Sequence, residues 1–155
     1  MTKRLLFLFA ALSLGACNLD IAQPTDSPTD PATESFAPAT GVDLTKMTRM
    51  PNGVYYQDLE VGTGDSLTTL RIVSVVFVAY LRTGFVFDHL TQPRLYDLHS
   101  VGITGFVDGI IGMRVGGTRK LVLPSSLGFG PLGAIGLGVP GNSTLVYDVT
   151  LVEIP

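Results

Sequence analysis

The chain has 155 residues, 46% of them hydrophobic, and a net charge of -3 at neutral pH. This length suffices for one domain with a sizeable core. The basic residues are scattered and form no run that could neutralise a row of phosphates, which argues against a nucleic-acid partner. His89 and His99 have no cysteine pair or carboxylate cluster beside them, so we expect exposed loop histidines, and neither a metal nor a cofactor.

The N-terminus has the pattern of an export signal. Two basic residues precede a run of ten almost wholly apolar residues, LLFLFAALSL, which is too short to span a bilayer. The run leads into LGAC, which resembles the bacterial lipobox, where a peptidase cuts before a lipid-modified cysteine. We therefore predict a lipoprotein signal peptide over residues 1–16, lipid on Cys17, and a domain held at the cell envelope outside the cytoplasm. An ordinary secretory signal with a chance cysteine is the alternative.

Residues 17–43 are rich in Pro, Thr, Ser, Ala and Asp and show no apolar period. A segment of this composition buries too little apolar surface to offset its ordering entropy. We predict a disordered, semi-rigid tether here, followed by a single folded domain over residues 44–155.

Four segments of that domain are predicted to be strands, and one to be a helix. The strand segments are residues 54–61, 71–81, 118–124 and 145–154, and residues 71–81 are apolar on both alternating faces, as in a strand covered on both sides. Residues 105–115 place Phe106, Ile110 and Met113 at helical spacing, with Thr104 as N-cap and a stop at Gly116. Four or five mostly antiparallel strands around one short helix predict an α+β half-barrel with an aromatic cleft.

The glycine-rich stretch SSLGFGPLGAIGLGVPGN, residues 125–142, contains the G-x-G-x-x-G pattern of a dinucleotide loop. That interpretation requires a helix immediately after the loop, and the glycines and prolines here would break one. The alternative is an ordered surface loop. Because loops of this length are usually functional, we expect it to cover a site.

Five segments in order resemble the FKBP-type peptidyl-prolyl cis-trans isomerases. They are VFVAY, VFD, ITGFVDGIIGMRVGGTRKLVLP, GFG and VPGNSTLVYDVTLVEI, and the likeness covers residues 53–154, about two thirds of the chain. The resemblance implies an antiparallel sheet wrapped round a short helix, activity on X-Pro bonds, and a flap over the proline pocket in the glycine-rich stretch.

The resemblance also implies a pocket. Its catalytic positions are Tyr80, Phe87, Asp88, Phe106 and Tyr147, and its substrate-binding positions are Ile103, Phe129 and Val139. Asp88 would accept a hydrogen bond from the Tyr80 hydroxyl and act on the substrate's carbonyl region. Phe129 departs from the family, which usually has a tyrosine there. The turn at residues 81–84 is about three residues short of the family's, and residues 89–100 align poorly, so one pocket aromatic is not identified and the role of Arg94 stays open.

An aromatic box suits this reaction, because rotating a prolyl peptide bond makes or breaks no bond to carbon. The expected partners are proline-containing polypeptides, the membrane through the N-terminal lipid, and macrolide ligands, with the protein a monomer. The alternatives are that the aromatics are core residues only, that the domain is a non-catalytic chaperone or assembly lipoprotein with this fold, or that it is a structural lipoprotein without a proline pocket.

Overall fold

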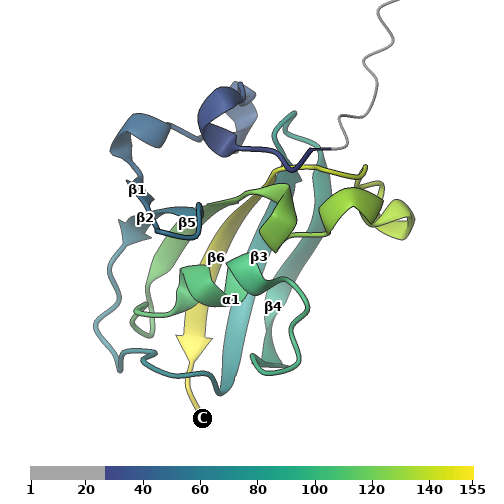
Figure 1. Ribbon diagram of the computed structural model, residues 1–155. Helices are drawn as coiled ribbons and strands as arrows, with labels where there is room; N and C mark the ends of the chain where they lie inside the picture. Colours follow the sequence, from purple (N-terminus) through teal and green to yellow (C-terminus); the bar gives the residue numbers. More distant parts are fainter. Residues whose placement is uncertain (1–26) are drawn as a thin grey trace, which may run out of the picture.

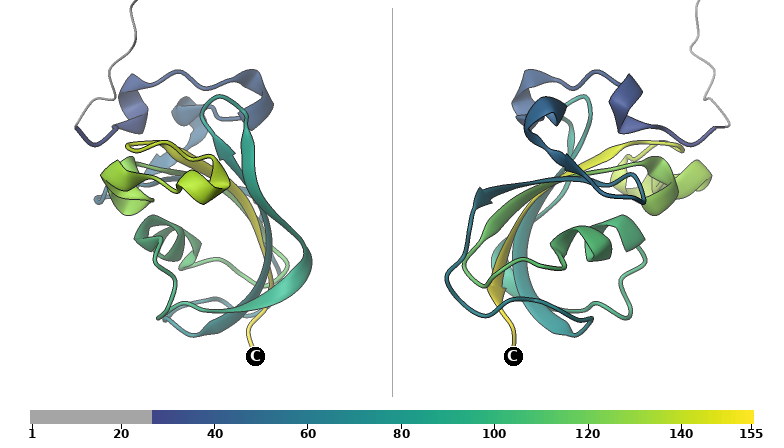
Figure 2. Two further views of the ribbon diagram at one scale, coloured as in Figure 1. Left: turned by 90° about the vertical axis from the view of Figure 1, so that its right-hand side faces the viewer. Right: turned by 60° about the vertical axis from the view of Figure 1, so that its left-hand side comes forward.

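The computed structural model describes residues 27–155, so the predicted signal peptide and Cys17 lie outside the described residues. The domain is a six-stranded antiparallel sheet that curves round one short helix (Figures 1 and 2), which confirms the predicted α+β class. The elements are β1 (Thr48–Arg49), β2 (Tyr55–Glu60), β3 (Ile72–Leu81), β4 (Val86–Asp97), α1 (Thr104–Ile110), β5 (Thr118–Leu123) and β6 (Leu145–Glu153). In space the strands follow the order β1-β2-β5-β6-β3-β4.

The sheet has two differently covered faces. On the face that we call the helix face, side chains of β3, β5 and β6 share the main core with α1, among them Val75, Phe77, Leu121, Leu123, Leu145, Tyr147, Val149 and Leu151. On the opposite face, which we call the strap face, Tyr55, Val122 and Val146 are buried with Met47 in a second, smaller core. Within β3, Val76 and Val78 on the strap face are only half-buried, so the second covering is partial.

Helix α1 is shorter than predicted. It ends at Ile110 rather than near Gly116, and Ile103, not Thr104, is the N-cap, without a side-chain hydrogen bond. The chain turns at Gly112, whose φ of 87° is accessible to glycine at little cost. The Gly112 amide donates to Leu67 O at 2.7 Å instead of continuing the helix. Among residues 27–155, no helix combines the length and apolar character needed to cross a bilayer.

Strand β4 was not predicted. It occupies the edge of the sheet and runs through residues 89–97, where most side chains are exposed. The pairing with β3 is also irregular, because Val75 pairs with Arg94 whereas Phe77 pairs with Leu90. An exposed edge strand with extra residues loses the period of two that reveals a strand in sequence.

The structure corrects the predicted tether for its described part, residues 27–43. Residues 27–47, which we call the strap, lie along the strap face and form 3-10 turns at Pro31–Thr33, Pro38–Thr40 and Leu44–Lys46. Phe36 and Val42 pack against the small core of Val122 and Val146. The prediction failed because these two apolar residues are too widely spaced to show a period, yet each finds a place on a preformed sheet.

Residues 125–144, which we call the flap, connect β5 to β6. No α-helix follows β5; three 3-10 turns occur instead, at Ser125–Leu127, Gly130–Leu132 and Ile135–Leu137, which confirms the loop interpretation. The loop closes on itself, because the Asn142 amide donates to Gly130 O at 2.8 Å. A Cβ at Gly141 would lie 2.0 Å from Pro131 O, so only glycine allows this closure.

Candidate functional site

A cleft of about 620 Å³ opens between the end of β4, the segment that leads into α1, and the flap. Its lining is mainly apolar and comes from all three parts: Arg94, Leu95, Tyr96, Asp97, Ser100, Val101, Gly102, Ile103 and Phe129. This volume lies within the range typical of small-ligand sites, about 300 to 1,000 Å³. Two of the predicted substrate-binding residues, Ile103 and Phe129, line it. The third, Val139, is buried in the core.

Behind the cleft lies a chain of aromatic rings in edge-to-face contact. The Tyr147 ring centroid lies 5.2 Å from that of Phe106, 6.0 Å from that of Phe87 and 5.8 Å from that of Phe77. Phe87 in turn contacts Phe129 at 6.0 Å, which joins this cluster to the cleft wall. Such contacts add about 0.5 to 1.5 kcal/mol per pair beyond area burial. Phe87, Phe106 and Tyr147 are each less than 10% exposed, so they support the cleft more than they line it.

A β-bulge brings Phe87 and Asp88 to the same region. Ala79 pairs with Asp88, but the next residue of β3, Tyr80, pairs with Val86, so Phe87 is the extra residue in β4. Phe87 therefore joins the core cluster while Asp88 stands opposite Ala79, on the same face. Bulges commonly re-aim side chains beside active sites, and this one sets an aromatic ring and a carboxylate next to each other.

Asp88 and Tyr147 form the polar part of the site. Ala79 pairs with Asp88 on one side and with Tyr147 on the other, so the three lie in a row across the sheet. Burial raises the pKa of the Tyr147 phenol, and the nearby Asp88 carboxylate and Tyr96 raise it further. Asp88 itself is exposed and accepts a hydrogen bond from the His89 amide at 2.8 Å.

Tyr80 does not belong to this site. It lies on the strap face, where it pairs with Val146 and packs on the small core, and burial and then Asp148 raise the pKa of its phenol. The proposed Tyr80–Asp88 hydrogen bond is therefore wrong. Phe77 lies three residues earlier, on the helix face. It contacts Phe106 and Tyr147 and so takes the position in the aromatic cluster that was predicted for Tyr80. When Phe77 rather than Tyr80 is matched to the family position, the segment up to Phe87 is three residues longer. The turn at residues 81–84 then no longer appears short.

Two site residues escaped the sequence analysis. Phe77 was missed because the family match along β3 was set three residues too late, at Tyr80. Tyr96 lies in the unrecognised strand β4; it lines the cleft, and its ring centroid lies 6.3 Å from that of Phe77. The pairing of Tyr96 with Val73 would have placed it on the helix face had β4 been recognised.

The charged residues near the cleft make local contacts. The Arg94 guanidinium lies 5.9 Å from the centroid of the Tyr96 ring, and no ion pair within residues 27–155 joins it to Asp88. His89 lies on β4 and His99 after it, both exposed, and His99 contacts Asp97 at 2.9 Å. In the part of the chain that the structure describes, no group of three or more His, Cys, Asp or Glu side chains could hold a metal ion.

Chemically, the site offers an apolar hollow with aromatic walls and the exposed Asp97 carboxylate at its edge, and next to it the exposed Asp88 carboxylate lies beside the buried Tyr147 phenol. Such a hollow can take a small apolar ring, remove water from the groups next to it, and act on a nearby dipole through the carboxylate charge.

Comparison with known proteins links this site to one family. Residues 64–152 match the family model described as FKBP-type peptidyl-prolyl cis-trans isomerase. The chain is 35% identical over 112 residues to FK506-binding protein 4 of Rhizopus delemar, and 37% identical over 107 residues to the protein of that name in Dictyostelium discoideum. These matches cover 70% and 67% of this chain, but the chain spans only 29% of the length of each relative.

Solved structures agree with the sequence matches. A crystal structure of a peptidyl-prolyl cis-trans isomerase from Pseudomonas syringae superposes with a TM-score of 0.65 at 30% identity, covering 70% of this chain and 80% of that one. The crystal structure of FkpA from Escherichia coli gives a TM-score of 0.64 at 33% identity, covering 70% and 51% of the respective chains.

Proposed function

The chain belongs to the FKBP-type peptidyl-prolyl cis-trans isomerase family, and from this premise we propose that it catalyses rotation about X-Pro bonds of exported polypeptides at the cell envelope. The observation that carries the catalytic part is the cleft of about 620 Å³ lined by Tyr96, Ile103 and Phe129 and backed by the aromatic cluster. This cleft fits a proline ring and its preceding residue.

Rotation about an X-Pro bond requires little from the protein beyond an apolar cleft. The barrier to rotation is lost amide resonance, about 18 to 20 kcal/mol. The planar amide is the more dipolar form, so transfer from water to an apolar cleft weakens its resonance and favours the twisted transition state. Burial of an apolar ring the size of proline contributes roughly 1.5 to 3 kcal/mol to holding the substrate.

Each part of the site has a role in this scheme. Phe129 and Ile103 contact the proline ring, while Phe87, Phe106 and Tyr147 keep the floor apolar and rigid. Asp88 interacts with the substrate's carbonyl region from beside Tyr147, whose burial keeps the phenol neutral and able to donate a hydrogen bond.

The test is isomerisation of X-Pro peptides by the chain from residue 18 onward, in a protease-coupled assay. Acceleration at catalytic concentration is expected, with a preference for an apolar residue before the proline. Asp88→Ala should lower the rate without unfolding the domain, whereas Asp65→Ala, an exposed carboxylate in the loop after β2, is the matched control and should not. A folded chain with no rate above background on several peptides would instead favour a non-catalytic chaperone, which suppresses aggregation in proportion to its own concentration.

The envelope location is supported by the sequence alone. The LGAC segment after ten apolar residues is the feature that supports lipid on Cys17. A single acyl chain anchors weakly, so the stable anchor proposed here needs more than one. Cys17→Ser should release the protein from the membrane fraction or block its processing. If the variant fractionates with membranes as the wild type does, the anchor is elsewhere or absent.

A second ligand class follows from the relatives' names, since several are FK506-binding proteins. We propose that FK506 enters the same cleft. Phe129 lacks a hydroxyl, so it gives the ligand's carbonyl no donor, and binding is correspondingly weaker than a tyrosine at this position would allow.

A further inference from the structure

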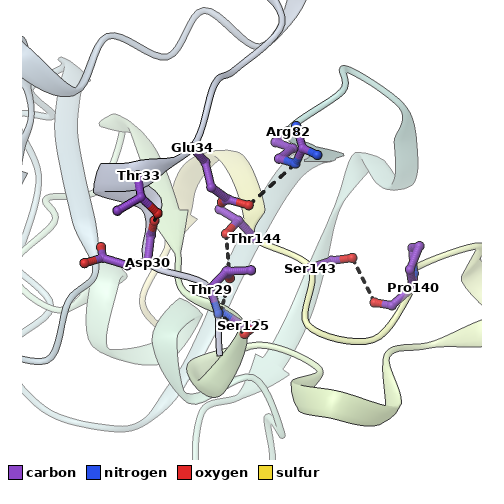
Figure 3. Close-up of polar contacts among 9 residues, drawn as sticks. All are labelled: Thr29, Asp30, Thr33, Glu34, Arg82, Ser125, Pro140, Ser143 and Thr144. Carbon is purple, nitrogen blue, oxygen red and sulfur yellow. Dashed lines mark hydrogen bonds and ion pairs between the residues drawn. The ribbon is translucent and has the colours of Figure 1, made fainter. Parts of the chain in front are cut away.

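The two stems of the flap meet at one residue of the strap, Thr29. Figure 3 shows Thr29 between Ser125, where the flap begins, and Thr144, where it ends. The Thr29 amide donates to Ser125 Oγ at 2.9 Å, and the Ser125 amide donates to Thr29 Oγ1 at 3.1 Å. The Thr144 hydroxyl also donates to Thr29 Oγ1, at 2.8 Å. Thr29 thus joins both stems with three hydrogen bonds.

These bonds lie in a water-poor setting. Ser125 is fully buried and Thr144 is 1% exposed. If the Thr29 hydroxyl were absent, the Ser125 amide and the Thr144 hydroxyl would lose a partner that water could not readily replace. The bonds are therefore more consequential than those of an exposed turn, such as the bond from the Thr33 hydroxyl to Asp30 O.

The strap that carries Thr29 is itself fixed to the domain. The buried Lys120 ammonium donates to Thr40 O at 2.6 Å, and the Ala37 amide donates to Arg82 O at 2.8 Å. Arg82 also pairs with Glu34, with 3.5 Å between Nε and Oε1 (Figure 3). The strap is therefore fixed to the rest of the domain at residues 34, 37 and 40, beyond Thr29, independently of the flap.

The flap in turn places a wall of the cleft. Phe129 is four residues beyond Ser125, lines the cleft and contacts the Phe87 ring at 6.0 Å. Any widening between the stems would move Phe129 relative to Phe87. The separation of the stems is thus coupled to the shape of the cleft.

We propose that Thr29 is a positioning residue for the isomerase reaction: its hydroxyl fixes the two flap stems and thereby holds Phe129 over the cleft. This rests on the proposed catalytic function. It extends that function beyond the matched family region, because residues 64–152 match the family model and the strap lies before them.

The test compares Thr29→Val, which keeps the side-chain shape but removes the hydroxyl, with Thr29→Ser, which keeps the hydroxyl. In the full chain in mild detergent, Thr29→Val should lower kcat/KM for a proline tetrapeptide about three- to tenfold, the equivalent of one or two hydrogen bonds, mainly through KM. Thr29→Ser should restore it. Thr33→Val is the matched control, since it removes a strap hydroxyl that does not touch the flap, and it should leave kcat/KM unchanged.

A second measurement does not depend on turnover. Amide hydrogen exchange in residues 125–144 should accelerate in Thr29→Val and return in Thr29→Ser, while exchange in β6 and α1 stays the same. If the wild type proves inactive, the catalytic proposal fails, and the exchange data still show whether Thr29 fixes the flap.

A double-mutant cycle covers the case in which Thr29→Val lowers stability generally. Thr144→Val removes the same bond from the flap side, so its effect on kcat/KM should be strongly non-additive with Thr29→Val. Additive effects, or a folded Thr29→Val with unchanged kcat/KM and unchanged flap exchange, would overturn the proposal.

Discussion

The helix face and the strap face of the sheet are covered in different ways. On the helix face, α1 and the flap lie over a continuous apolar core in which aromatic rings meet edge to face. On the strap face, an irregular segment covers a small core and contacts the buried Lys120, which pairs with the partly exposed Asp148 at 2.6 Å. The same β-strands supply both, because neighbouring residues of a strand point to opposite sides.

The difference shows how one sheet can separate two tasks. The helix face carries the cleft and tolerates little change in volume, since its side chains are closely packed. The strap face carries no ring of the aromatic cluster, but it holds the segment that reaches the flap. Changes on the helix face should therefore affect stability and activity together, whereas changes on the strap face should affect stability first.

Phe77→Ala should have the largest effect. Removal of a buried aromatic side chain costs about 3 to 5 kcal/mol, and here it would also remove ring contacts to Tyr96, Phe106 and Tyr147. Urea unfolding should show this loss, and activity should fall even where the variant stays folded. If Phe77→Ala is as stable and active as the wild type, the aromatic cluster does not support the cleft.

Lys120→Met should come next, and it tests the strap face. It leaves Asp148 without its cation and Thr40 O without its donor. Removing one partner of a buried pair costs about 3 to 5 kcal/mol, and because the Asp148 side chain is 28% exposed, about 2 kcal/mol is expected. Lys120→Met combined with Asp148→Asn should recover much of it. An unchanged urea midpoint for Lys120→Met would show that the pair does not anchor the strap.

Alkaline unfolding should report on the helix face through Tyr147. Its folded-state pKa is raised above the ordinary value of 10.0, so its contribution to stability is fully present below pH 10 and is lost as the pH rises toward the folded-state pKa. The loss attributable to this group approaches about 1.4 kcal/mol per pH unit. Tyr147→Phe should reduce the slope of unfolding free energy against pH above 10, and equal slopes for the two proteins would contradict this assignment.

Phe129→Tyr should tighten FK506 binding through one added hydrogen bond. A neutral hydrogen bond contributes about 0.5 to 1.5 kcal/mol, or a few-fold to tenfold in Kd, as calorimetry would measure. Leu132→Tyr, at an exposed flap position outside the cleft, is the matched control. Unchanged affinity in Phe129→Tyr would mean that the ring edge does not face the ligand's carbonyl.

Tyr80→Phe should have the smallest effect. Because Tyr80 lies on the strap face, loss of its hydroxyl should change kcat/KM by less than about twofold and stability by less than about 0.5 kcal/mol. A drop in kcat/KM comparable to that of Asp88→Ala would restore Tyr80 to the catalytic site.

Much of the fold was accessible from sequence because four strands and the helix stand out as apolar or periodic segments, although the strand at residues 71–81 is apolar on both faces. Strand β6 alternates cleanly from Leu145 to Leu151, and its bounds were nearly correct. Strand β4 was missed because its residues are exposed at the sheet edge and interrupted by irregular pairing. The strap was missed because it depends on tertiary contacts that no local pattern encodes.

The sequence predicted which residue types form the site better than it predicted which strand positions face it. Phe87, Phe106, Tyr147 and Phe129 are linked by ring contacts, and the roles that the family resemblance implies for them stay predictions. Tyr80 was misplaced because a sequence match along a strand can slip and so assign a residue to the wrong face. The bulge at Phe87 places Phe87 and Asp88 on the same side of the sheet. It arises from the pairing of β3 with β4, which the sequence does not show.

The position of β6 in the sheet bears on the order in which this protein folds. Strand β6 follows the other strands in the chain, yet it lies between β5 and β3. Before residues 145–153 leave the ribosome, β1, β2 and β5 have no sheet contact with β3 and β4. Thr29, by contrast, is synthesised early, but its hydrogen-bond partners Ser125 and Thr144 lie 96 and 115 residues further along the chain. Because distant contacts form only after their loop-closure entropy has been met, the strap should dock last although it is synthesised before the strands of the sheet.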